Sequence, residues 1–186
     1  PTYAIKKFNK DGKFINTFGS FGLGDGEFIT PGGLGVDKEN NIYATDFGEN
    51  NNIQKFDQNG NFIMKFGTYG TGDREFLNPT DVAIDSLGNV FVVDSFNNRI
   101  QKFDENGNLI TTWGTAGAGP GQFYNPTGMT VQFPQGNVFV ADSGNSRIQQ
   151  FDNSGKFVKE YSIGENTGDI TNIDLDVDSD GKIYLT

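Results

Sequence analysis

The residues best suited to metal chemistry are carboxylates near the end of the printed sequence. The run Asp176-Val177-Asp178-Ser179-Asp180-Gly181 has the D-x-D-x-D-G spacing with which a calcium loop begins. A complete loop of that kind also needs a Glu at its twelfth position, and none is available here. The corresponding segments of the repeats described below are typical hairpin turns, which favours a turn here as well.

Asp174 and Asp176 nevertheless differ from the residues at equivalent places in the other repeats, which are mostly Gly, Ala or Thr. Carboxylates on an innermost strand could hold a cation in a central channel. We therefore expect no cofactor, with Ca²⁺ at Asp174 and Asp176 as the alternative.

Two acid–base pairs lie at the ends of short loops. Asp94 is followed by Arg99, and Asp142 by Arg147, at the same place in successive repeats. A catalytic pair has no reason to recur in this way, so we interpret both pairs as structural clasps that fix their loops. Asp46 faces Asn52 instead of an arginine, which predicts a weaker first clasp.

Composition excludes several classes of function. The 186 residues include no His and no Cys, which removes the common general base, thiol nucleophiles and His- or Cys-ligated zinc. The formal net charge of −10 argues against a nucleic-acid partner, because such partners are bound mainly through Lys and Arg. No apolar run approaches the roughly 20 residues that span a bilayer.

The strongest pattern is an internal repeat. The motif Ile53-Gln54-Lys55-Phe56-Asp57 returns at Ile100 and Ile148 and, more loosely, at Ile5, with spacings of 48, 47 and 48 residues. Each unit contains four short Val-, Ile- and Phe-rich segments separated by Asn-Gly or Asp-Gly turns, which is the signature of β-hairpins. Four strands in a unit of this length predict the blade of an all-β propeller.

These residues resemble the NHL-repeat family of β-propellers. The match comprises the segments 78–85, 88–94 and 97–103, and the copy over 125–151 repeats it. The resemblance implies a single propeller region over residues 1–186. We expect blades at about 33–67, 81–114 and 128–162, and a fourth made of 174–186 together with 1–19. The resemblance also implies a closed ring, most often of six blades.

Four units leave the form of the ring open. The two end segments could pair within one chain and close four blades. Two chains could exchange their ends, giving a homo-oligomer through shared blades, or the sequence could be a segment of a longer propeller.

The loops after the second and fourth strands should emerge on one face, and they carry the candidate partner-binding residues. Phe47 and Phe96 stand where the third unit has Gly144, and Phe21 and Tyr69 stand where it has Ala116. Aromatic side chains on glycine-rich loops add little to a blade core and are typical binding anchors. The complete set of candidates is Phe21, Phe47, Glu49, Tyr69, Arg74, Phe96 and Asn97.

We predict a non-enzymatic interaction or scaffold module that binds a basic or neutral protein, or a small ligand, on this loop face. One alternative is a calcium-dependent propeller enzyme, because some propellers of this kind resemble lyases and lactonases. A second is a structural repeat of a secreted or cell-surface assembly, which similar acidic, cysteine-free, Asn- and Gly-rich chains resemble. An extracellular or cell-surface location follows from that analogy alone.

Overall fold

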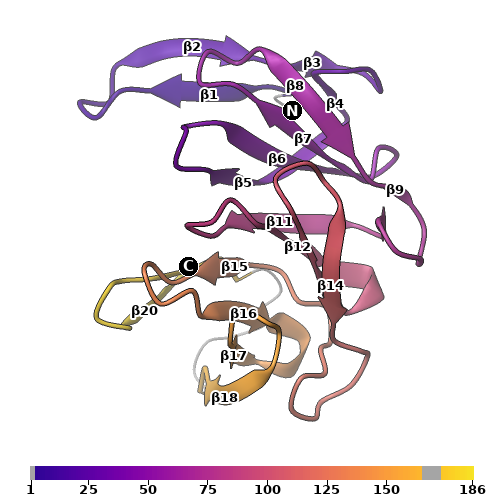
Figure 1. Ribbon diagram of the computed structural model, residues 1–186, viewed down its shortest axis with the longest axis vertical. Helices are drawn as coiled ribbons and strands as arrows, with labels where there is room; N and C mark the ends of the chain where they lie inside the picture. Colours follow the sequence, from indigo (N-terminus) through magenta and orange to yellow (C-terminus); the bar gives the residue numbers. More distant parts are fainter. Residues whose placement is uncertain (1–2, 165–172) are drawn as a thin grey trace.

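The computed structural model describes residues 3–164 and 173–186 (Figure 1). The described chain is made of β-strands and two 3₁₀ turns, η1 (Ser95–Asn97) and η2 (Ser143–Asn145). No helix among the described residues is long and apolar enough to cross a membrane. The all-β architecture predicted from the repeats is therefore the one observed.

Three sheets are complete four-stranded antiparallel blades, each with its strands in sequence order. The first contains β5 (Thr30–Val36), β6 (Ile42–Phe47), β7 (Asn52–Phe56) and β8 (Phe62–Phe66). The second contains β11 (Pro79–Ile84), β12 (Val90–Asp94), β13 (Arg99–Phe103) and β14 (Leu109–Trp113). The third contains β15 (Met129–Val131), β16 (Val138–Asp142), β17 (Arg147–Phe151) and β18 (Phe157–Ser162).

Turn chemistry sets the register inside each blade. In the turn between β11 and β12, Asp85 Oδ1 accepts hydrogen bonds from the backbone N–H groups of Leu87 (2.9 Å) and Asn89 (2.9 Å). Gly88 adopts φ +87°, a conformation that L-residues rarely take. The turn places Ile84 opposite Val90, and the alternation of side chains along both strands follows from that pairing.

Two smaller sheets flank the blades. The N-terminal half-sheet pairs β1 (Ile5–Phe8) with β2 (Phe14–Phe18), and the C-terminal half-sheet pairs β19 (Leu175–Val177) with β20 (Ile183–Leu185). The first has the sequence of the two outer strands of a blade, and the second has that of the two inner strands. Residues 1–2 of the predicted fourth blade lie outside the described residues.

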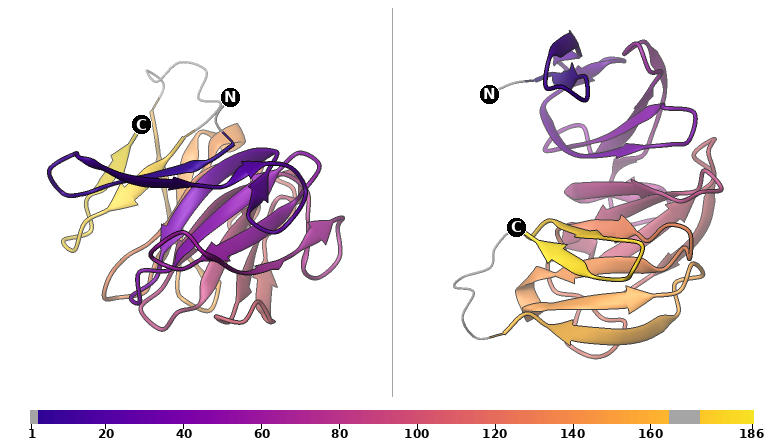
Figure 2. Two further views of the ribbon diagram at one scale, coloured as in Figure 1. Left: turned by 90° about the horizontal axis from the view of Figure 1, so that it is seen from above. Right: turned by 90° about the vertical axis from the view of Figure 1, so that its left-hand side faces the viewer.

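The two half-sheets do not join into a fourth blade. They are separate two-stranded sheets, and they lie at different places along the molecule (Figure 2, right). The prediction that the ends close a four-bladed ring within one chain is therefore not realised in the described residues. Repeat counting cannot decide closure, because closure depends on the angle between neighbouring blades.

Stacked aromatic side chains hold successive blades together. Phe66, from the last strand of the first blade, lies 4.9 Å from Phe103 of the second, measured between ring centroids. Trp113 of the second blade packs in the same way on Phe151 of the third at 5.9 Å. Phe103 and Phe151 are fully buried, so each of these contacts removes most of a ring from water and stabilises the blade interface.

Candidate functional site

The loops after the second and fourth strands of each blade lie against one another, as the meander predicts. Asn97 Nδ2, in the loop after β12, donates a hydrogen bond of 2.9 Å to the carbonyl oxygen of Gly70, in the loop after β8. Asn145 Nδ2 makes the equivalent bond of 2.9 Å to Gly117. We call this side of the molecule the loop face. It consists of residues 19–29, 47–51, 67–78, 95–98, 114–126 and 143–146.

The glycine-rich parts of this face are closed by their own side chains. Short parallel pairs form between β3 (Ser20–Phe21) and β4 (Glu27–Phe28), and between β9 (Thr68–Tyr69) and β10 (Glu75–Phe76). Glu75 Oε2 accepts a hydrogen bond of 2.8 Å from the backbone N–H of Gly72, and Gln122 Oε1 accepts the same bond from Gly119 at 2.8 Å. These glycine-rich segments are thus self-contained loops between blades.

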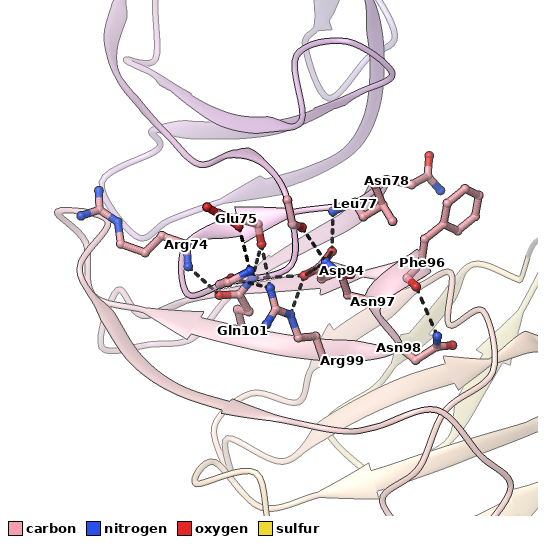
Figure 3. A network of polar contacts seen from close by, with 12 residues as sticks. Arg74, Glu75, Leu77, Asn78, Asp94, Phe96, Asn97, Asn98, Arg99 and Gln101 are labelled. Atoms are coloured by element: carbon pink, nitrogen blue, oxygen red, sulfur yellow. Dashed lines mark hydrogen bonds and ion pairs between the residues drawn. The ribbon is translucent and has the colours of Figure 1, made fainter.

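Asp94 and Arg99 form a buried clasp at the base of the loop face (Figure 3). Arg99 Nε lies 2.7 Å from Asp94 Oδ2, and the Asp94 side chain is completely buried. The same carboxylate accepts a hydrogen bond from the backbone N–H of Leu77 at 2.8 Å and further bonds from Asn97 and Gln101. Arg99 also donates to the carbonyl oxygens of Gly72 and Glu75, so the pair ties together two loops and a strand.

The third blade repeats the clasp, whereas the first replaces it. Arg147 Nε lies 2.9 Å from Asp142 Oδ2. Asp46 accepts hydrogen bonds from the backbone N–H groups of Ile29 and Thr30 and from Asn50 Nδ2. Asn50, which also donates to the carbonyl oxygen of Gly22, is the counterpart of Asn97. Asn52 stands opposite Asp46 in the register that Arg99 occupies in the second blade, so the first clasp lacks its arginine, as the sequence predicts.

Three of the candidate aromatic residues stand out from the loop face. The exposed fractions of Phe21, Tyr69 and Phe96 are 63%, 69% and 57%. In Figure 3 the ring of Phe96 points away from the clasp. Phe21 has one aromatic neighbour, Tyr3, at 4.8 Å between ring centroids. Side chains of this size on adjoining loops offer anchoring area that the blade cores do not use.

Phe47 lies at the inner edge of the loop face, beside the cavity described below. It ends β6 directly after Asp46, so it occupies the place of Ser95 in the second blade rather than that of Phe96 or Gly144. Phe47 is partly buried and lines this central cavity.

The polar candidates also divide into two groups. The side chains of Glu49 and Arg74 are exposed, and that of Arg74 extends away from the polar network in Figure 3. Asn97 donates to both carboxylate oxygens of Asp94 and to Gly70, so it belongs to the clasp and is not free for a partner.

One exposed aromatic residue of the loop face was not among the candidates. Tyr124 is 55% exposed and lies over Gly144, where a Cβ would stand 2.3 Å from the tyrosine ring. In the third blade, the aromatic side chain at the position of Phe96 is thus supplied by Tyr124 from the neighbouring loop. The sequence contained one sign of this exchange: the third unit has Gly144 in place of Phe96 and has a tyrosine, Tyr124, directly before Asn125.

A cavity of about 830 Å³ runs along the inner strands β5, β11, β15 and β19 and reaches the loop face at Phe47 and Asn78. Among the described residues, three carboxyl groups line it, those of Asp81, Asp174 and Asp176, and no Lys or Arg does. Sequence reasoning had selected Asp174 and Asp176 and had missed Asp81. The cavity is therefore a site of negative charge that favours a positively charged group.

Asp81 has an unusual environment. Burial, assisted by the negative charge of Asp174, raises the pKa of Asp81 to about 7, against the lowering effect of hydrogen bonds from the backbone N–H groups of Met129 and Val82. This carboxyl group therefore changes its charge near neutral pH.

The carboxylates of the calcium alternative are hydrogen-bonded to their own backbone. Asp174 Oδ1 and Asp176 Oδ1 each accept a hydrogen bond of 2.8 Å from the next backbone N–H of their own strand. Within residues 3–164 and 173–186, no group of three or more acidic, His or Cys side chains is arranged to hold a metal ion. The D-x-D-x-D-G run forms the turn between β19 and β20, in which Asp178 Oδ1 accepts hydrogen bonds from the N–H groups of Asp180 and Lys182.

Comparison with known proteins identifies the fold. Residues 86–177 match a family described as a 6-bladed beta-propeller. No curated protein matches the sequence significantly. The chain is similar to solved structures of a streptogramin B lyase (17% identity, TM-score 0.70), of hydrazine synthase from Kuenenia stuttgartiensis (18%, 0.69) and of the dihydro-heme d1 dehydrogenase NirN (14%, 0.65).

These likenesses cover 99%, 99% and 98% of this chain but only 55%, 49% and 36% of the three other chains. The chain thus spans about half the length of the lyase, and identities this low carry information on fold alone. Together with the blade topology, they establish that the chain has a β-propeller fold built of four-stranded antiparallel blades.

Proposed function

We propose that this chain is a non-enzymatic binding module of NHL-like blades that holds a partner on its loop face. The observation that carries the proposal is the exposure of Tyr69 and Phe96 on adjoining loops, where the hydrogen bond from Asn97 to Gly70 fixes one loop against the other. A rigid frame beneath exposed aromatic side chains lowers the entropic cost of binding.

The charge of the face defines the chemistry of the partner. Asp25, Glu49 and Asp73 are exposed on the loop face, and Arg74 is the exposed cation among the candidates. The cavity that reaches this face carries three carboxyl groups and no basic residue. A partner with a basic group therefore gains from long-range attraction, whereas an acidic partner is repelled.

A displayed library of random short peptides tests this proposal directly. We expect the immobilised chain to enrich peptides that combine Lys or Arg with apolar residues, and we expect enrichment to weaken with added salt. The matched control is the double variant Leu87→Ala/Phe133→Ala, which removes two apolar side chains, 77% and 70% exposed, from the turns on the opposite side. Failure to enrich any sequence family, or equal enrichment of acidic peptides, would contradict the proposal.

One observation favours a propeller enzyme as the second candidate. A carboxyl group whose pKa is about 7 and which lines a cavity has the property expected of a general acid or base at neutral pH. The similar structures include a streptogramin B lyase, which is as compatible with this candidate as with a binding module. A calcium titration followed by calorimetry tests the calcium-dependent form of the enzyme, because Ca²⁺ bound at Asp174 and Asp176 would release heat that Asp174→Asn abolishes.

A further inference from the structure

The inner strands carry an alternation of glycine and aspartate at equivalent positions. Gly33 in β5, Asp81 in β11, Gly128 before β15 and Asp174 before β19 occupy the same place in successive repeats. A Cβ built on Gly33 would stand 2.2 Å from Asp81 Oδ1. A Cβ on Gly128 would stand 3.4 Å from Asp174 Oδ1. Asp81 therefore leans over Gly33, which has to lack a side chain, whereas the closest group to Gly128 is the carbonyl oxygen of Ile173, 2.5 Å from the Cβ position.

Asp81 connects its own blade to both neighbours. Its Oδ1 accepts a hydrogen bond of 2.8 Å from the backbone N–H of Val82 in the same strand. Its Oδ2 accepts a hydrogen bond of 2.7 Å from the backbone N–H of Met129, which begins the inner strand of the next blade. With Gly33 on the other side, this single side chain contacts three successive inner strands.

Threonine hydroxyl groups, which do not titrate, bridge the two neighbouring boundaries, and at the second of these Thr130 Oγ1 also donates to Asp176 Oδ1 at 3.2 Å. Thr45 Oγ1 donates a hydrogen bond of 3.4 Å to the carbonyl oxygen of Thr80, between the first and second blades. Thr127 Oγ1 donates to the carbonyl oxygen of Ile173 at 2.8 Å, between the third blade and β19. At the boundary between the second and third blades the contact is made by a carboxyl group, so its charge depends on pH.

The charged and titratable groups around Asp81 are few. The stretches of β5 and β15 that line the cavity with it contribute Gly, Leu, Met, Thr and Val residues, and β19 with the residue before it contributes Asp174 and Asp176. Asp174 disfavours the ionised form of Asp81, and no basic residue lines the cavity to compensate. Ionisation of Asp81 therefore places a second negative charge beside an existing one in a partly desolvated space.

We propose that Asp81 is a proton-dependent contact between blades, which keeps the inner strands packed while it is neutral and loosens them around the cavity when it ionises. The demand of the buried carboxylate for water drives the loosening and repulsion from Asp174 adds to it, and together they outweigh the hydrogen bonds from the N–H groups of Met129 and Val82. The cavity then becomes wetter and more negative on the alkaline side of neutrality. This pH dependence is separate from partner binding, since it depends only on the contacts of Asp81 with the neighbouring inner strands.

The raised pKa of Asp81, about 7 against about 3.9 for an unperturbed Asp, gives the sign of the effect on stability. The folded chain holds the proton that the unfolded chain has lost, so the free energy of unfolding falls as pH rises from about 4 to about 7 and then levels off. The variant Asp81→Asn carries no charge at any pH. We expect it to remove this fall, whereas the control Asp73→Asn, at an exposed loop position, leaves the fall unchanged.

Native-state hydrogen exchange distinguishes a proton-dependent contact from a purely structural one, because only the first makes the protection of the Met129 amide depend on pH through Asp81. We expect protection of the Met129 amide, corrected for intrinsic pH dependence, to drop between about pH 4 and about pH 7 in the wild type and to stay constant in Asp81→Asn. The amide of Val92, inside the second blade, serves as the internal reference. Equal pH dependence of Met129 protection in both proteins would overturn the proposal.

A direct titration of the wild type covers the case in which Asp81→Asn does not fold. The ¹³C chemical shift of the Asp81 carboxyl group should report a midpoint near neutral pH, and Asp174→Asn should shift that midpoint downward. A midpoint near 4 in the wild type would also overturn the proposal.

Discussion

Lys55 Nζ lies 4.8 Å from the centroid of the Tyr43 ring, across the β6–β7 pair. The second blade has Lys102 over Phe91 in the same relationship at 4.9 Å. This cation–π pair joins the second and third strands in the first two blades, and in the third blade Gln150 stands opposite Phe139 instead. Tyr184 in β20 and Lys7 in β1 occupy the equivalent positions in the two half-sheets.

We expect the two half-sheets to complete each other between two copies of the chain. The blade register would set Ile183 opposite Phe8 and Tyr184 opposite Lys7, and it would cover the exposed side chains of Phe8 and Tyr184. Light scattering should give a molar mass near twice 20.3 kDa, and Lys7→Glu should lower it toward that of one chain. A wild-type mass of one chain, or a dimer that Lys7→Glu weakens no more than Lys10→Glu does, would contradict this pairing.

Gly33→Ala should destabilise the chain by about 1–3 kcal/mol, because overpacking at a tight contact forces neighbouring groups to move. The added methyl group would stand 2.6 Å from the Cα atom of Asp81 as well as close to its carboxyl group, so a side-chain rotation alone cannot relieve it. Urea unfolding measures the loss. Leu87→Ala, at an exposed turn, should change the free energy of unfolding by no more than about 0.5 kcal/mol, and equal effects of the two substitutions would count against the tight packing.

The clasp should be more sensitive to loss of its acid than to loss of its base. Asp94→Ala leaves Arg99, with 13% of its side chain exposed, and several donors unpaired, so we expect a loss of about 3–5 kcal/mol. Arg99→Met should cost less, about 2 kcal/mol, since Leu77, Asn97 and Gln101 still donate to the carboxylate. Chemical denaturation checks the order, with the exposed Arg74→Met as the neutral control. The reverse order would show that Arg99 is the dominant partner.

Stability should also fall in acid, for a reason separate from Asp81. Burial acts to raise the pKa of Asp85, but hydrogen bonds from the side chain and backbone of Asn89 outweigh it and lower the pKa below the usual value. A lowered pKa in the folded state stabilises the fold above about pH 4, and this contribution is lost as pH falls through the folded value. Thermal melts should show Asn89→Ala to be destabilising at pH 5.5 and much less so at pH 2.5. A constant difference at both pH values would refute the linkage.

Local sequence information was enough to predict the four strands of each blade, the turns between them and the positions of the clasps, but not the short strand pairs β3–β4 and β9–β10. Asp94 and Arg99 lie within one loop, and Asp85 and Asn89 within one turn, so spacing alone brings them together. Contacts between blades were not predictable in this way. Asp81 and Met129 are 48 residues apart, and their hydrogen bond depends on how two sheets pack at the hub.

The alignment of repeats also failed where a loop changes length. Phe47 follows Asp46 directly and lines the cavity, and the asparagine that donates to the carboxylate comes four residues after Asp46 (Asn50) but three after Asp94 (Asn97). Tyr124 escaped notice because its ring fills the space over Gly144 from a different loop. In such cases the same space is filled by a side chain from a different loop, so the shape of the blade is kept although the repeats no longer align residue by residue.

The most direct test of the binding face is a calorimetric titration with one peptide selected by the wild-type chain. We predict that Tyr69→Ala/Phe96→Ala weakens binding by tenfold or more, since a pair of aromatic anchors contributes about 2 kcal/mol or more. The melting temperature should stay unchanged, because both rings are exposed. The double variant Leu87→Ala/Phe133→Ala should bind as the wild type does. Undiminished affinity of the Tyr69→Ala/Phe96→Ala variant would contradict the assignment of the loop face as the binding surface.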